Sequence, residues 1–396
     1  MPKGVLSEAR RIFMELAELS NLDRAEALDK ECGEDLHLRA QVEVLLRAES
    51  SAGAFMSNPT SDGGGSSQAS LALGPKEAAS SEIGRYKLLE QIGEGGMGTI
   101  WMAEQREPVK RRVALKIIKL GMDTKQVIAR FEAERQALAL MDHPHIAKVF
   151  DAGATETGRP YFVMEYIKGI PTLEYCDLDK VDTRGRIQLF KAVCHAILHA
   201  HQKGIIHRDI KPNNVLVTMH DGVPVPKVID FGIAKATNSE LTAKTLFTEH
   251  RQMIGTPAYM STEQAEMSGL DIDTRSDVDS LGVLLYELLT GTTPFDTQAL
   301  LESGFEEMMR VIREDEPHKP STRISSLGDT GTRMAQQRKL DPLRLSNMMR
   351  GDLDWIVMKC LEKDRTRRYE TANGLAADLD RHLGDEPVVA GPPTAG

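Results

Sequence analysis

The change of hydrophobic pattern along the chain constrains its fold more than any other feature. Three segments have the pattern of β-strands: Tyr86–Trp101, Val113–Ile118 and Tyr161–Val163. A helical pattern at 128–141 lies between the second and third of them. From Thr183 onward helical spacing dominates, most clearly at 187–202 and 277–290. This order predicts an α+β protein with a small antiparallel β lobe that holds one main helix, followed by a larger helical lobe.

The two ends of the chain differ from this central part in hydrophobic pattern and composition. Apolar residues recur at helical spacing within 1–50, which predicts a short all-α extension of three helices. Residues 51–84 include the run SDGGGSSQAS and few large apolar side chains, so we expect a flexible linker there. The main domain then spans 85–384, with lobes at 85–165 and 166–384, and a flexible tail follows at 385–396.

Composition argues against several classes of function. The 396 residues carry a formal net charge of −10 and the basic residues are scattered, so the sequence predicts no nucleic-acid binding. The apolar stretch LGVLLYELL at 281–289 is far shorter than the ~20 residues that cross a bilayer, so we expect no membrane span. The cysteines have no metal-binding or redox spacing, which indicates buried, reduced thiols. They are Cys32, Cys176, Cys194 and Cys360.

A glycine-rich segment, IGEGGMGTI at 92–100, is the first candidate for chemistry. Gly93, Gly95 and Gly98 would let backbone amides approach phosphate oxygens without a side chain in the way. Taken alone, such glycines serve equally well to turn a hairpin. The helix that a dinucleotide-binding fold needs directly after the loop is absent from the pattern, which argues against a nicotinamide site.

A lysine follows one hairpin later, in VALK at 113–116. Lys116 would reach the α- and β-phosphates of a nucleotide, although a lysine at a strand end is more often a solvated edge charge. Glu134, on the following helix, would orient it, or would be a surface carboxylate like its neighbours. Both alternatives stay open from the residues alone.

The segments HRDIKPNN at 207–214 and DFG at 230–232 hold the groups that phosphoryl transfer needs. Asp209 would align an attacking hydroxyl, Lys211 would stand beside the γ-phosphate, and Asn214 would offer an oxygen to magnesium. Asp230 follows the apolar pair Val228–Ile229, and a carboxylate at the end of a buried strand suits the same ion. A chance match at this many positions is improbable.

Taken in order, GEGGMG, VALK, Glu134, HRDIKPNN, DFG and GTP…E resemble the protein-kinase signature. The resemblance covers about 86–384, and phrases such as HQKGIIHRDIKPNNVLV and SLGVLLYELLTG are similar to the bacterial eukaryotic-like (Hanks-type) serine/threonine protein kinases. It implies a two-lobed kinase fold, ATP with Mg²⁺ (or Mn²⁺) as cofactors, protein substrates with Ser/Thr acceptors, and self-association for autophosphorylation. It also implies a cytoplasmic protein, or the cytoplasmic portion of a longer membrane protein.

The resemblance assigns roles residue by residue. The catalytic residues would be Asp209 and Lys211, with Lys116 paired to Glu134, and the metal ligands would be Asn214 and Asp230. The hinge would start after the gatekeeper Met164. The ATP-binding residues would be Ile92, Gly93, Glu94, Gly95, Gly96, Met97, Gly98, Thr99, Ile100, Ala114, Lys116, Glu165, Ile167 and Leu216.

Two further segments carry expectations from the resemblance. Arg208 beside Asp209 implies an activation loop that a phosphate orders, with candidate acceptors Thr242, Thr245 and Thr248. Thr256 and Glu263 would belong to the platform that receives the substrate, and Glu263 would pair with Arg368.

Several features of the sequence keep alternatives open. Thr262 stands where these kinases usually have proline, and Asp279 where an aromatic residue is common, which leaves a pseudokinase scaffold as the alternative. A small-molecule phosphotransferase is the second rival, although it would generally lack the substrate platform.

His195 and His199 have the spacing of a zinc pair, but a structural role is favoured because no glutamate adjoins His195. The polar insertion at 321–350 reads as a solvated excursion.

Overall fold

The computed structural model describes residues 79–95, 98–118, 141–231, 257–266 and 272–391, together with Lys30, Glu31, Val42 and Leu138. Most of the predicted N-terminal extension, the linker up to 78 and most of the helix expected at 128–141 lie outside these residues. The chain divides into two compact units, one formed by Met1–Asp123 and Phe150–Ile170, the other by Thr124–Val149 and Pro171–Gly396. Within the described ranges no helix combines the length and the apolar character that a membrane crossing requires.

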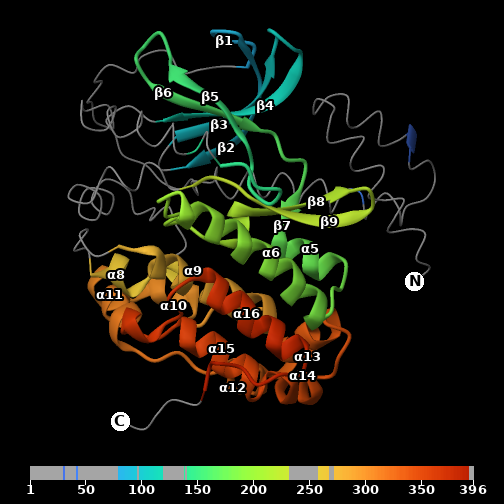
Figure 1. Cartoon of the computed structure of the whole chain (residues 1–396), viewed down its shortest axis with the longest axis vertical. Coiled ribbons are helices and arrows are strands. Elements are labelled where there is room, and N and C mark those ends of the chain that lie inside the picture. Colours follow the sequence, from blue (N-terminus) through green and yellow to red (C-terminus); the bar gives the residue numbers. More distant parts are fainter. Residues whose placement is uncertain are drawn as a thin grey trace, which may run out of the picture. The chain divides into compact units, whose positions relative to one another are not determined.

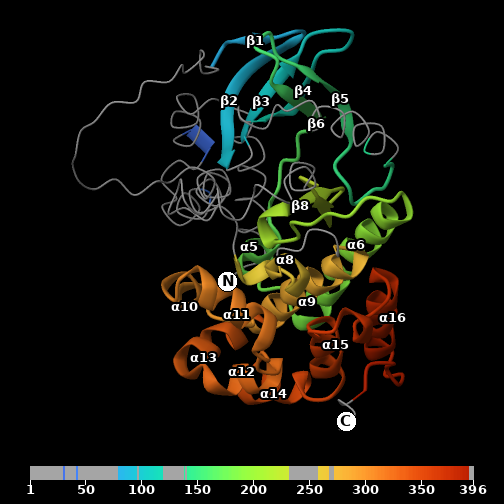
Figure 2. The same ribbon diagram turned by 90° about the vertical axis from the view of Figure 1, so that its left-hand side faces the viewer.

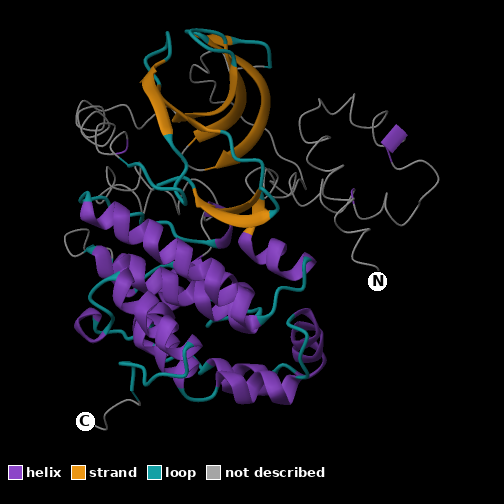
Figure 3. Ribbon diagram, turned by 45° about the vertical axis from the view of Figure 1, so that its right-hand side comes forward, coloured by secondary structure: helices purple, strands orange, loops and turns teal. Residues whose placement is uncertain are grey.

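The first unit is built on a six-stranded sheet with the order β1-β2-β3-β4-β6-β5 (Figures 1 and 3). Neighbouring strands from β1 to β4, and β4 with β6, pair antiparallel. The strands are β1 (Glu82–Ile83), β2 (Tyr86–Gly95), β3 (Gly98–Gln105), β4 (Arg111–Ile118), β5 (Val149–Ala154) and β6 (Pro160–Glu165). The strand segments predicted from the sequence are therefore confirmed.

One face of this sheet forms an apolar core, which explains why apolar residues alternate along the strand sequences. On β4 the side chains of Val113, Leu115 and Ile117 are fully buried in it. Alternate residues of a strand point to opposite faces, so Ala114 and Lys116 share the other face of β4. They too are buried. The central position of β4, between β3 and β6, is therefore incompatible with a solvated edge lysine at 116.

The second unit is mainly helical (Figures 2 and 3). Its helices are α5 (Thr172–Leu178), α6 (Thr183–Gln202), η1 (Pro212–Asn214), η3 (Pro257–Tyr259), α8 (Thr262–Ala265), α9 (Thr274–Thr290), α10 (Thr297–Glu302), α11 (Phe305–Glu314), α12 (Pro320–Ser326), α13 (Gly328–Gln337), α14 (Pro342–Met349), α15 (Asp352–Cys360), η4 (Arg365–Arg367) and α16 (Ala372–Leu383). The helices predicted at 187–202 and 277–290 are confirmed as α6 and α9, and each starts earlier, after an aspartate cap.

Helix α9 is the centre of the second unit. It contacts α6, α12, α15 and α16 (Figure 2), and nearly all its residues are buried. A Cβ added at Gly282 would lie 2.4 Å from the Cβ of Cys360, so glycine is what allows α15 to approach α9 this closely. The helix ends at Gly291, whose left-handed φ of 80° is the usual helix stop.

The sequence analysis did not predict the hairpin of β8 (Val215–His220) and β9 (Val223–Val228), which forms a three-stranded sheet with β7 (Ile170–Pro171). Asp221 and Gly222 both have positive φ, as a tight hairpin turn requires. The two prolines of β9 hide the strand pattern, and they are tolerated because β9 is an edge strand.

The expectation of a solvated excursion at 321–350 is wrong. These residues form most of α12 and all of α13 and α14, which contact one another (Figure 2). Arg338, at the end of α13, is buried and donates to the carbonyl oxygens of Leu288 at 2.9 Å and Met334 at 2.8 Å. A guanidinium suits the end of α9 because the last carbonyls of a helix lack intrahelical donors.

The sequence assigns 385–391 to the flexible tail, yet two of these residues are bound to α16. The backbone N–H groups of Val389 and Ala390 each donate to the Asp378 carboxylate at 2.8 Å, and Ala390 is buried. Tyr369 donates to the same carboxylate. The described part of the tail is thus held by hydrogen bonds up to Ala390.

Candidate active site

The glycine-rich segment is a hairpin in the first unit. Ile92, Gly93, Glu94 and Gly95 end β2, and Gly98, Thr99 and Ile100 begin β3, with Gly95 opposite Gly98. Gly96 and Met97 lie outside the described residues. A Cβ at Gly98 would lie 2.0 Å from the carbonyl oxygen of Ile117, so this glycine is required by the approach of β4. Because a strand follows the loop, a dinucleotide-binding fold is excluded.

Lys116 lies on β4 directly opposite Ile100 of β3 and Phe162 of β6. Only 8% of the lysine is exposed. A buried ammonium needs an anion nearby, so its burial favours a functional lysine. Its expected partner Glu134 lies outside the described residues. Ala114 shares the face of Lys116, and Glu165 and Ile167 lie at the end of β6 and just after it.

In the second unit the structure brings Asp209, Lys211 and Asn214 into direct contact. The Lys211 Nζ lies 3.0 Å from Asp209 Oδ2, and the Asn214 Nδ2 donates to the same oxygen at 3.0 Å and to the Asp209 carbonyl at 2.7 Å. Asn214 is buried in the turn η1, which Pro212 starts. Asp209 is therefore fixed by two neighbours and keeps part of its side chain exposed.

The backbone of this loop is held from beneath by Asp277, which the sequence analysis did not assign. Its carboxylate accepts the backbone N–H groups of His207 at 2.7 Å and Arg208 at 2.8 Å, and the ring of His201 donates to it at 2.8 Å. Arg208 has a left-handed φ of 63°. A strained backbone of this kind persists only where its surroundings hold it.

His207 connects this loop with the strand that leads to Asp230. The ring is fully buried, and burial lowers its pKa, so the neutral form is favoured. Its Nδ1 accepts the N–H of Asp209 at 3.3 Å and its Nε2 donates to the Ile229 carbonyl at 3.2 Å. Asp230, the next residue, also has a positive φ, 57°. The two expected metal ligands, Asn214 and Asp230, are further linked because Ile229 N donates to the Asn214 carbonyl at 2.9 Å.

The donor set of Asn214 and Asp230 fits magnesium. An amide oxygen and a carboxylate are hard ligands, and protein-bound Mg²⁺ commonly takes only one or two carboxylates and completes its shell with phosphates and water. Within the described part of the chain no group of three or more His, Cys, Asp or Glu side chains is placed to hold an ion. The described cysteines, Cys176, Cys194 and Cys360, are buried free thiols whose pKa values burial raises.

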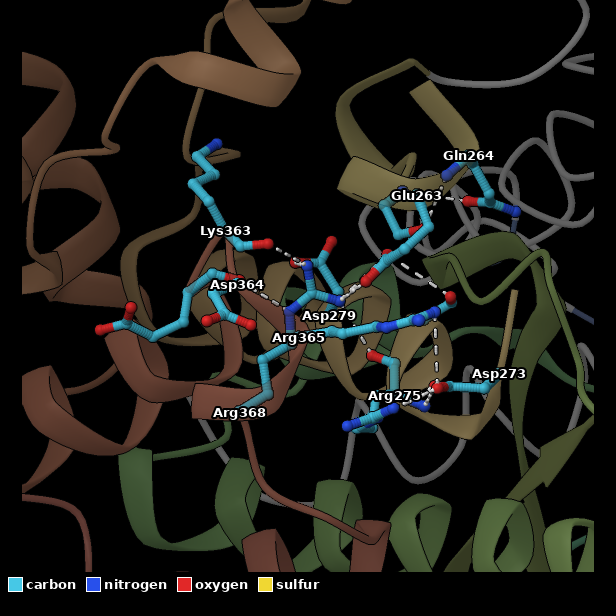
Figure 4. Close-up of polar contacts among 12 residues, drawn as sticks. Glu263, Gln264, Asp273, Arg275, Asp279, Lys363, Asp364, Arg365 and Arg368 are labelled. Carbon is cyan, nitrogen blue, oxygen red and sulfur yellow. Dashed lines mark hydrogen bonds and ion pairs between the residues drawn. The ribbon is translucent and has the colours of Figure 1, made fainter. Parts of the chain in front are cut away.

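The described part of the predicted platform starts at Pro257 and contains α8, which Ser261 caps. Glu263 forms the expected ion pair with Arg368, with its oxygens 2.8 and 3.1 Å from Nη1 (Figure 4). Asp279 faces the same guanidinium at 3.6 Å. Burial raises the pKa of Asp279 to about 7, against the attraction of Arg368. Thr256, like Thr242, Thr245 and Thr248, lies outside the described residues.

Comparison with known proteins decides the family. The protein kinase domain matches residues 86–379, which is more than half of the chain. The chain belongs to the protein kinase family. Solved structures agree with this fold: the kinase domain of PknI from Mycobacterium tuberculosis superimposes with a TM-score of 0.56 at 22% identity, over 78% of this chain and 100% of that one.

The relatives of this kinase domain are bacterial serine/threonine kinases, as the resemblance implied. The serine/threonine-protein kinase PknB of Mycobacterium tuberculosis is 36% identical over 310 residues, which are 76% of this chain and 44% of PknB. The serine/threonine-protein kinase PrkC of Bacillus subtilis is 33% identical over 298 residues, 75% of this chain and 40% of PrkC. The chain thus spans less than half the length of these relatives.

The kinase domain also contains contacts to the loop of Asp209 that the sequence reasoning missed. Asp277 was not assigned, although an acid within a helix as apolar as α9 is itself a signal, since burial of a carboxylate needs partners. The hydrogen bond that Gln264 Nε2, on α8, donates to the Arg208 carbonyl oxygen at 2.9 Å has no such signal, because a glutamine in a polar segment is ordinary.

Proposed function

We propose that this chain is an ATP-dependent serine/threonine protein kinase, which transfers the γ-phosphate of ATP to Ser or Thr hydroxyls of proteins. The observation that carries the proposal is the contact of Asp209 with Lys211 and Asn214, in a loop whose strained backbone Asp277 holds. Family membership supports it.

The residues of the second unit support a division of roles. Asp209 accepts the proton of the substrate hydroxyl as the phosphate is transferred, and its fixed orientation places that hydroxyl in line. Lys211 stabilises negative charge on the γ-phosphate. Asn214 Oδ1 and the Asp230 carboxylate would hold Mg²⁺, which would neutralise charge on the phosphates when bound; Mn²⁺ would suit the same oxygens.

The residues of the first unit would bind the nucleotide. The glycine hairpin from Ile92 to Ile100 would cover the phosphates with backbone N–H groups, and Lys116, paired with Glu134, would hold the α- and β-phosphates. Ala114 and the hinge residues Glu165 and Ile167 would contact the adenine. Leu216, half-buried on β8 of the second unit, would do the same.

Arg208 supports control by phosphorylation. Among the described residues its Nε is buried without a hydrogen-bond acceptor, and a phosphate is the bidentate partner that guanidinium groups prefer. We infer that a phosphate on Thr242, Thr245 or Thr248 binds there, after self-association of two copies for autophosphorylation. We place the reaction in the cytoplasm, where ATP is available and thiols such as Cys194 stay reduced.

Transfer of ³²P from γ-labelled ATP to a generic basic protein tests the proposal. The wild type should label the substrate, and Asp209→Ala should lower the rate about 10²–10⁴-fold, because the group that orients and deprotonates the hydroxyl is lost. Equal labelling by both proteins, or none by the wild type, would contradict it and favour the pseudokinase alternative. Lys116, Asp209, Asn214 and Asp230 are all present, so we expect the first result.

A further inference from the structure

Gln264, the third residue of α8, binds two parts of the molecule with the two ends of its side chain. Its Oε1 accepts the backbone N–H of Ser261 at 3.0 Å, and the Ser261 Oγ in turn accepts the backbone N–H of Gln264 at 3.3 Å. This reciprocal pair is the capping box of α8. The other end, Nε2, donates to the carbonyl oxygen of Arg208 at 2.9 Å (Figure 4 shows Gln264 beside Glu263).

The carbonyl that Gln264 binds belongs to the peptide group immediately before Asp209. The N–H of that peptide group is the N–H of Asp209, which His207 Nδ1 accepts at 3.3 Å. On the other side of Arg208, its own N–H is bound by Asp277 at 2.8 Å. Both peptide groups that flank the left-handed Arg208 are therefore fixed by side chains.

Without the bond from Gln264 the Arg208 carbonyl oxygen would be free to rotate about ψ, and a change of ψ at Arg208 that φ of Asp209 does not compensate turns the Cα–Cβ bond of Asp209. A left-handed φ is strained in a non-glycine residue, so Arg208 tends to relax unless its neighbours hold it. Asp277 holds the N-terminal side from α9. Gln264 holds the C-terminal side from α8, the helix that also carries the platform residue Glu263.

We propose that Gln264 is a positioning residue for phosphoryl transfer, whose amide nitrogen couples the substrate platform to the orientation of Asp209. The inference rests on the proposed function. It predicts that the loss of this one hydrogen bond lowers the rate of transfer without unfolding α8 and without a matching loss of substrate affinity.

Gln264→Glu separates this role from the capping box. Glutamate serves a capping box as well as glutamine does, so its oxygen still accepts the N–H of Ser261. At neutral pH the second carboxylate oxygen would face the Arg208 carbonyl oxygen, and the bond would be replaced by repulsion. When the carboxyl group is protonated, its O–H donates to that carbonyl again.

The experiment measures kcat, KM for peptide and ATP, and melting temperature for the full chain and for Gln264→Glu between pH 5.5 and pH 8.5. We expect the variant to lose about 10–100-fold in kcat at pH 8, as small misplacements of catalytic groups do. We expect KM within about threefold, a melting temperature that stays well above the assay temperature, and a variant-to-wild-type ratio of kcat that rises as the pH falls. Arg208, Asp209, His207 and Asp277 are common to both proteins, so the ratio isolates position 264.

Gln188→Glu is the matched control. Gln188 is exposed on α6, and its side-chain oxygen accepts from Lys191 at 3.3 Å, an interaction that glutamate keeps. Its kcat should equal that of the wild type at every pH. A Gln264→Glu variant with wild-type kcat, or with a loss of kcat that no change of pH reverses and that follows its melting temperature, overturns the inference. A wild type without transfer overturns the proposed function itself.

Discussion

Asp277 and Asp279 lie two residues apart on α9, and both are buried, yet their surroundings differ. Asp277 accepts two backbone N–H groups of the loop before Asp209 and a third donor from His201. Asp279 faces the Arg368 guanidinium at 3.6 Å, which Glu263 binds more closely, and burial raises its pKa to about 7. Both carboxylates are buried, so depth of burial does not explain the difference. The number of hydrogen-bond donors around a buried carboxylate decides whether it stabilises or destabilises the fold.

The two acids also differ in what they serve. Asp277 joins α9 to the loop that leads to Asp209, so under the proposed function its contacts concern the reaction. Asp279 belongs to the cluster that joins α8 to the segment before α16 (Figure 4 shows Asp279 beside Arg368). There the Arg368 Nε donates to the backbone carbonyl oxygen of Glu362 and Nη1 to that of Arg275. Removing charges one at a time distinguishes the two acids.

The largest expected effect follows the removal of the shared cation. Arg368→Met leaves Glu263 and Asp279 buried without their counter-charge, and we expect a loss of about 3–5 kcal/mol in the free energy of unfolding at pH 8, measured in urea. The loss should shrink at pH 5, where Asp279 is protonated.

Arg367→Met is the control for this change. The neighbouring Arg367 is exposed and lies 3.8 Å from Glu362, so its replacement should change stability by less than ~0.5 kcal/mol. Equal stability of the two variants would show that Arg368 does not neutralise the buried acids.

A smaller effect, dependent on pH, is expected from Asp279→Asn. The folded-state pKa of Asp279, about 7, lies above the ordinary unfolded value of about 4, so between these values the folded protein binds the extra proton. The contribution of Asp279 to the free energy of unfolding is therefore largest below pH 4, falls as the pH rises from 4 to 7, and stays low above pH 7. Asparagine cannot ionise. The free energy of unfolding of the variant, relative to that of the wild type, should therefore rise by on the order of 2 kcal/mol from pH 5 to pH 8.

Urea unfolding across this range measures the change, with the exposed Asp385→Asn as control. The difference in the free energy of unfolding between the wild type and Asp385→Asn should stay constant with pH. A constant difference for Asp279→Asn as well would mean that the folded protein does not retain the extra proton.

The smallest effect is expected at Thr262. It is the first residue of α8, where proline is favoured because the N–H there has no intrahelical acceptor. Ser261 before it is extended, with ψ of 160°, as a residue before proline must be. Thr262→Pro should therefore raise stability by about 0.4–1 kcal/mol, seen as a higher melting temperature. Thr262→Ala, which keeps the N–H, should show no such gain; a loss with proline would mean that the threonine N–H is needed.

Much of this fold follows from local pattern. The strands of the first unit and helices α6 and α9 were predictable because apolar residues recur at the period of each element, and Asp209, Lys211 and Asn214 because they lie close together in the sequence. The ion pair of Glu263 with Arg368 joins residues 105 positions apart, and only the family resemblance led to it.

Other features depend on contacts that no local pattern records. Helices α12–α14 look like a solvated segment because of their many Arg and Asp residues, yet Arg338 is buried against carbonyl groups at the end of α9. The sequence likewise marks Asp279 as unusual and passes over Asp277, since which of two acids on one helix meets backbone N–H groups depends on how another loop folds. The bond from Gln264 to Arg208 is invisible for the same reason.

The most direct test of this account compares Asp277→Asn with Asp279→Asn in the rate of phosphate transfer at saturating ATP and peptide, at pH 8. Asp277→Asn replaces one carboxylate oxygen with a donor that faces a backbone N–H, so we expect kcat to fall about 100-fold. Asp279→Asn should stay within about twofold of the wild type. Equal losses in both variants, or an undiminished kcat in Asp277→Asn, would contradict the claim that catalysis depends on how this loop is held.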